Sequence, residues 1–111
     1  MTGDSPEAAF HRVCPAKALR EREGKSFVVM GRAVAVFKDG GGLHAISDRC
    51  PHNGMPLHDG NLECGILTCR WHGWQFDVTT GRTPGTEAGA LGPRLRVYSV
   101  RESEGWIEVS L

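Results

Sequence analysis

Short apolar stretches separated by glycine-rich or polar turns run along most of the chain. Residues 25–30 and 32–38 are rich in valine and phenylalanine, and Gly31 separates them. The turn 39–42 contains three glycines, and apolar and polar positions alternate again over 43–46. Two such runs around a tight turn are typical of a β-hairpin.

The same pattern predicts further strands on both sides of this hairpin. We expect strands at 10–13, 65–68 and 75–78, and a closing hairpin formed by 95–100 and 106–109 across the turn 102–105. Residues 15–23 begin with Pro15 and contain good helix formers, so we expect one short helical turn there. Many short strands at close spacing favour an all-β barrel or sandwich.

Length and charge narrow the class of protein. The chain has 111 residues, with 13 Lys and Arg against 13 Asp and Glu, so we expect one neutral domain over 1–111. Zero net charge does not favour nucleic acid or an anionic membrane as the partner. The longest apolar run, 33–37, is far shorter than the roughly 20 residues of a membrane span.

The two ends of the chain predict a small cytoplasmic protein. The first seven residues have neither a basic segment nor an apolar one, so they do not resemble a secretory signal. In the cytoplasm thiols stay reduced. Met1 at the start, and Leu111 directly after the last predicted strand, lead us to expect a complete small protein.

Cysteine and histidine recur together in two turns. Cys50 and His52 form one pair, and Cys69 and His72 form the other. Pro51 with Gly54 favours a sharp turn in the first, and Gly73 does so in the second. The strand predicted at 65–68 brings the two turns side by side. The sequence therefore predicts a metal site with two sulfur and two nitrogen ligands.

Two metal centres use such ligands. One is a single tetrahedral zinc, and the other is a [2Fe–2S] cluster in which two histidines replace two cysteines on one iron. Zinc sites usually have their cysteines paired in one half and their histidines in the other. Here each half contains one of each, which favours a binuclear cluster.

The motifs resemble those of the Rieske iron–sulfur proteins, and the resemblance extends from about Phe10 onward. The stretches that carry it are Cys50-Pro51-His52-Asn53-Gly54, Cys69-Arg70-Trp71-His72-Gly73-Trp74 and the proline-containing Gly92-Pro93-Arg94-Leu95, which resembles a third loop that covers the cluster. The resemblance implies an antiparallel β-sandwich or barrel with a small cluster-binding subdomain over about 48–78.

The resemblance also implies the ligands of one [2Fe–2S] cluster per chain. Cys50 and Cys69 would bind one iron through their thiolates, and His52 and His72 would bind the other through Nδ1. We interpret Cys14 and Cys64 as buried small apolar residues rather than ligands. Two other side chains are also assigned no role, since we expect His58 to be a solvated loop residue and Trp106 to lie in the core.

The resemblance implies a soluble ferredoxin, which is an electron-transfer component and not itself an enzyme. Such a monomer carries one electron at a time from a reductase to a terminal oxygenase. The sequence has no G-x-G-x-x-G fingerprint for a nicotinamide or flavin. Two alternatives stay open, namely the small subunit of an assimilatory nitrite reductase, bound to its large subunit, and a structural zinc module that mediates interactions.

Two further expectations concern the cluster end. Apolar residues there would form the docking surface, with Arg49, Asp59 and Arg70 at its rim; they are Pro51, Met55, Pro56, Leu57, Trp71 and Trp74. The high-potential relatives have a serine and a tyrosine just after the second histidine. Trp74 and Phe76 occupy these positions and have no aliphatic or phenolic hydroxyl, so we expect a low reduction potential.

Overall fold

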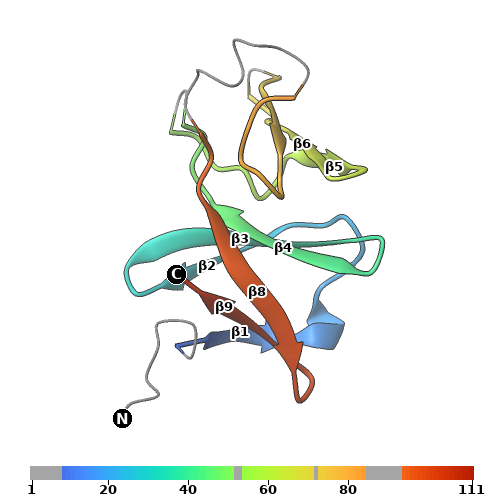
Figure 1. Ribbon diagram of the computed structural model, residues 1–111, viewed down its shortest axis with the longest axis vertical. Helices are drawn as coiled ribbons and strands as arrows, with labels where there is room; N and C mark the ends of the chain where they lie inside the picture. The colour runs from blue at the N-terminus through green and yellow to red at the C-terminus, as the bar shows by residue number, and fades with distance from the viewer. Residues whose placement is uncertain (1–8, 52–53, 72, 85–93) are drawn as a thin grey trace.

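The computed structural model in Figure 1 describes residues 9–51, 54–71, 73–84 and 94–111. In these residues nine strands and one three-residue 3₁₀ turn form, which confirms the predicted all-β class. No helix of this part of the chain has the length and apolar character needed to cross a membrane. The elements are β1 (His11–Pro15), η2 (Ala16–Ala18), β2 (Lys25–Val29), β3 (Arg32–Asp39), β4 (Gly42–Ser47), β5 (Asn61–Glu63), β6 (Ile66–Thr68), β7 (Gln75–Asp77), β8 (Val97–Ser103) and β9 (Trp106–Ser110).

The strands form two antiparallel sheets of unequal size. The larger has the order β1-β9-β8-β4-β3-β2, and the smaller has the order β5-β6-β7. The large sheet curls until its edge strands β1 and β2 come into contact. The small sheet lies beyond one end of the large one, at the top of Figure 1. The chain enters it after β4 and leaves it before β8.

Strand β3 contributes side chains to both hydrophobic cores, the one inside the large sheet and the one between the two sheets. Val34 and Val36 point into the interior of the curled large sheet, whereas Ala35 and Phe37 pack against the small sheet. All four side chains are fully buried. Side chains alternate between the two faces of a strand, so an uninterrupted apolar run indicates burial on both faces. The run at 33–37 is therefore apolar throughout because both faces of β3 are buried.

Tight two-residue turns connect β2 to β3, β3 to β4, β5 to β6 and β8 to β9. In each, both turn residues have positive φ, as in the type I′ turns whose twist matches that of paired strands. Met30, Cys64 and Glu104 adopt this conformation at φ of about 50° although they are not glycines. The turn at Glu104–Gly105 is shorter than the predicted 102–105, because β8 continues to Ser103.

Three sequence expectations need correction. Strand β5 was not predicted, because Asn61–Glu63 is a short segment with one apolar residue, Leu62. The helical turn within 15–23 is limited to Ala16–Ala18, because the chain then extends to bury Leu19 among the large-sheet side chains. Trp106 is half-buried rather than in the core, since its ring packs under the Arg12 guanidinium at 5.2 Å.

Candidate metal centre

The two predicted cysteine turns have the same backbone geometry. The Gly54 N–H donates to the Cys50 carbonyl at 2.7 Å, and the Cys50 N–H donates to the Met55 carbonyl at 2.8 Å. The second turn repeats this at the same spacing, because Gly73 donates to Cys69 at 3.0 Å and Cys69 donates to Trp74 at 2.7 Å. Each cysteine is therefore fixed by two backbone hydrogen bonds at the base of its loop.

Glycine is needed at the fifth position of both loops. Gly54 and Gly73 each have φ of +73°, a left-handed conformation that strains residues with a Cβ. This confirms the expectation that the two glycines allow the sharp turns. The first loop follows β4, and the second connects β6 to β7, which begins directly after Trp74.

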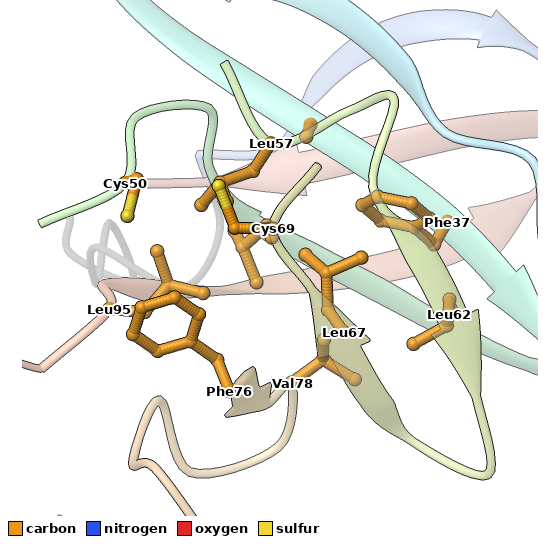
Figure 2. Close-up of a cluster of buried hydrophobic side chains, with 11 residues drawn as sticks. Phe37, Cys50, Leu57, Leu62, Leu67, Cys69, Phe76, Val78 and Leu95 are labelled. Carbon is orange, nitrogen blue, oxygen red and sulfur yellow. The ribbon is translucent and has the colours of Figure 1, made fainter. Parts of the chain in front are cut away.

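Both cysteines are buried in one group of side chains. Cys50 is 2% exposed and Cys69 is 1% exposed, and both belong to the apolar cluster between the two sheets. Figure 2 shows them at one end of this cluster, near Leu57 and Leu95, with Phe37 and Leu62 at the opposite end. Residues 19 positions apart in the sequence thus place two thiols in one water-poor environment, as the motif spacing predicts.

A third loop with the same hydrogen bonds follows directly. The Gly81 N–H donates to the Asp77 carbonyl at 2.7 Å, and the Asp77 N–H donates to the Arg82 carbonyl at 2.8 Å. Asp77 occupies the first position of this loop, as Cys50 and Cys69 do in theirs. Its carboxylate accepts hydrogen bonds from the hydroxyl and the N–H of Thr79. The Thr79 hydroxyl contributes most to lowering the pKa of Asp77. The hydrogen bonds of this carboxylate thus stabilise the turn in which Asp77 itself lies.

A buried carboxylate that no sequence motif marks, Asp48, closes the first loop. One Asp48 oxygen accepts the N–H groups of Leu57 and His58 at 2.7 and 2.8 Å, and the other lies 2.8 Å from His58 Nδ1. Asp48 precedes the loop and its partners follow it, so we call this arrangement the Asp48 clasp. His58 is therefore held by Asp48, and our interpretation of it as a merely solvated residue was wrong.

The other two cysteines differ from Cys50 and Cys69. Cys14 is buried in the large sheet, as expected, and this burial raises the pKa of its thiol. Cys64 is exposed at the β5–β6 turn, so its predicted burial was wrong. The two-residue turn Cys64–Gly65 lies beyond the paired residues of β5 and β6, which leaves the Cys64 side chain in solvent. No disulfide joins any of the four cysteines, all of which are described.

The apolar surface at this end is smaller than the sequence indicated. Trp71 and Trp74 are exposed by 48% and 42%, and Pro56 is exposed as well. Leu57 is completely buried in the cluster of Figure 2, so its predicted place on the surface was wrong. The Asp48 clasp turns it inward. At the rim Arg70 lies 3.4 Å from Asp59 and also packs over Trp71.

The geometry fits a metal centre bound by sulfur from two loops. Thiolate sulfur is a ligand that iron and zinc both accept, and Cys50 and Cys69 supply one thiol from each loop. The predicted nitrogen ligands His52 and His72 lie outside the described residues, as do Gly92 and Pro93 of the third motif. Leu95, the last residue of that motif, is buried beside the cysteines.

Comparisons with known proteins identify the family of this fold and site. A family model of the Rieske [2Fe-2S] domain matches residues 9–98. The ferredoxin of carbazole 1,9a-dioxygenase from Nocardioides aromaticivorans IC177 is similar with a TM-score of 0.81 and 28% identity, over 92% of this chain and 97% of that one. A chain in a complex of reduced oxygenase and oxidized ferredoxin of carbazole 1,9a-dioxygenase has a TM-score of 0.79 and 26% identity, with 91% and 92% covered.

Curated relatives differ in how much of their length the chain matches. The anthranilate 1,2-dioxygenase ferredoxin subunit of Burkholderia cepacia is 29% identical over 104 residues, which are 94% of each chain. The 4beta-methylsterol monooxygenase of Methylococcus capsulatus is 47% identical over 60 residues, 53% of this chain and 16% of that protein. This chain spans only 11–17% of the length of the first seven curated relatives.

The Asp48 clasp predicts a specific loss of stability. Asp48→Ala removes the acceptor of two backbone N–H groups and should lower the free energy of unfolding by about 1–3 kcal/mol. It should also speed bleaching of the iron-loaded protein, because the first loop opens more easily. Asp48→Asn retains an oxygen at the same place and should lose less. Thermal unfolding and visible absorbance measure both effects.

The matched control is Asp59→Ala, which removes an exposed partner of Arg70 and should cost at most about 1 kcal/mol. Equal losses in Asp48→Ala and Asp59→Ala would contradict the clasp.

Proposed function

The chain belongs to the Rieske [2Fe-2S] family, and we propose that it is a one-electron carrier that passes electrons from a reductase to a terminal oxygenase. The observation that carries the proposal is the pair of matching loops with their buried cysteines, on a fold similar over almost its whole length to dioxygenase ferredoxins. The [2Fe–2S] cluster of this family takes up and releases one electron. In this proposal substrate oxidation takes place in the partner.

We propose that the ligands are Cys50, His52, Cys69 and His72. Burial of the two thiols at equivalent loop positions supports the cysteine half of this set. The motif supports the histidine half. Cys14 belongs to a different apolar cluster, and Cys64 is exposed on a turn, so neither adjoins the two loops. We also propose that residues 48–78 act as the cluster-binding subdomain, because they contain both loops and the small sheet.

The ligand set predicts which cysteines can be replaced. Cys50→Ser or Cys69→Ser should abolish the visible absorption and reduce bound iron to background, because a buried hydroxyl is a poor substitute for thiolate. Cys64→Ser and Cys14→Ala should retain colour and iron. Iron content per chain and the absorption spectrum of purified protein measure the result. Loss of colour in Cys64→Ser would overturn this division of the cysteines.

We propose that the partner docks at the cluster end of the molecule. The exposed rings of Trp71 and Trp74 give this end apolar area, and their loop carries Cys69. A small apolar surface with polar residues around it suits a transient interface. Leu57 takes no part in this surface because it is buried.

The side chains around the cysteines support a low reduction potential. Phe76 is fully buried in the same cluster as Cys50 and Cys69, and Figure 2 shows it near Leu95 at their end of the cluster. Its ring has no hydroxyl to donate to sulfur. Hydrogen bonds to sulfur favour the more negative reduced state, so a site with fewer donors holds its electron less tightly.

The midpoint potential should therefore lie toward the low end of the roughly −150 to +300 mV Rieske range. Phe76→Tyr adds a donor near the thiols and should raise the midpoint. Phe37→Tyr is the control, because it adds a hydroxyl at the far end of the same cluster. Voltammetry measures all three proteins. A wild-type midpoint above about +150 mV would contradict the proposal.

Affinity capture tests the partner assignment. The tagged, iron-loaded protein should retain the subunits of an oxygenase and a flavin-containing or nicotinamide-linked reductase from cells that express it, and mass spectrometry identifies them. The same subunits should be lost when Trp71→Asp is used. Stoichiometric recovery of a sirohaem-containing subunit instead would overturn the oxygenase role and favour the nitrite reductase alternative.

A further inference from the structure

A cavity of about 340 Å³ lies on the flank of the first cysteine loop and is rich in arginine. It forms where β3 begins, β4 ends and the chain enters β8, close to the junction of the two sheets in Figure 1. Three arginines line it together with Ser47 and Tyr98; they are Arg32, Arg49 and Arg96. We call this cavity and its three arginines the arginine groove.

Among the described residues, the three arginines of the groove have no carboxylate beside them in its lining. Three arginines elsewhere do have carboxylate partners, since Arg12 and Arg101 both contact Glu108, and Arg70 contacts Asp59. No ion pair within the described ranges joins the groove arginines to a carboxylate. Although the chain is neutral overall, the described lining of this cavity thus contains three positive side chains and no negative one.

The groove is attached to the cysteine loops by backbone and packing contacts. Arg49 directly precedes Cys50, and Arg96 follows Leu95, which packs in the same cluster as the cysteines. The Ser47 N–H donates to the Arg96 carbonyl at 2.9 Å, which holds the end of β4 beside the start of β8. Anything bound in the groove therefore lies beside the first loop rather than at the far end of the large sheet.

We propose that the arginine groove binds carboxylate side chains on an acidic surface of the protein redox partner. All three arginines are exposed, and an exposed guanidinium is screened by water and salt, so a single small anion gains little there. Several carboxylates on one protein surface add their contributions, orient the encounter and raise its rate. The partner would then contact the cluster end asymmetrically, on the side of the first loop. This inference rests on the proposed carrier function.

The test uses iron-loaded protein and a hexaglutamate peptide as the probe, in calorimetry at about 10 mM ionic strength, where the Debye length is about 30 Å. Hexaglutamate should bind, and the affinity should fall as salt is added. The variant Arg32→Gln/Arg49→Gln/Arg96→Gln should bind about tenfold more weakly, since each exposed pair contributes a factor of about two or three. Inorganic phosphate should bind too weakly to compete.

The control variant Lys17→Gln/Arg20→Gln/Arg22→Gln removes the same charge from three exposed positions in the segment that also contains the exposed Glu21 and Glu23. It should change the affinity less than twofold. Equal weakening in both variants would show a net-charge effect only, and phosphate competition would show a small-anion site. Either result would overturn the proposal.

If the triple variant loses iron, the single variants Arg32→Gln and Arg96→Gln replace it in the test. Each should weaken binding of hexaglutamate about two- to threefold. The assay requires neither an oxygenase nor electron transfer, so its failure leaves the carrier function standing.

Discussion

The site depends on one backbone constraint, the pair of hydrogen bonds that closes each cysteine loop through a glycine with positive φ. These bonds hold Cys50 and Cys69 at the same place in two loops, while the apolar cluster between the sheets keeps water from both sulfurs. The three strands of the small sheet are too short to form a hydrophobic core by themselves. Ala35 and Phe37 of the shared strand β3 therefore pack against their side chains and complete that core. The large sheet thus positions the loops, and the glycines shape them.

The same loop hydrogen bonds occur a third time at Asp77, and this loop packs against Leu95. Gly81 has φ of +79°, and a Cβ at this position would lie 2.0 Å from the Leu95 carbonyl oxygen. Leu95 is thereby drawn against the side of the cysteine cluster. One local geometry accordingly positions two thiols and also a buried side chain of the same apolar cluster. The loops differ in the functional group at their first position, which is a thiol in Cys50 and Cys69 and a carboxylate in Asp77.

The sequence predicted the fold class, most strands and the cysteine loops, because alternation, glycine turns and ligand spacing are local patterns. It did not predict contacts that depend on tertiary packing. The Asp48 clasp joins two sides of a loop, and neither Asp48 nor His58 has a local pattern that marks it. Leu57 is buried because the clasp turns it inward, and Cys64 is exposed because two adjacent residues with positive φ form a projecting turn. The arginine groove likewise joins three separate segments, and a net charge of zero conceals it.

We propose that the two loops hold one cluster through two sulfur and two nitrogen ligands, and electron paramagnetic resonance of the dithionite-reduced protein distinguishes this ligand set from the alternatives. We expect a rhombic signal whose average g value lies well below that of clusters bound by four cysteines, because imidazole ligation localises the electron on the iron bound by histidine. A silent spectrum from iron-loaded protein, or the signal of an all-cysteine cluster, would contradict it.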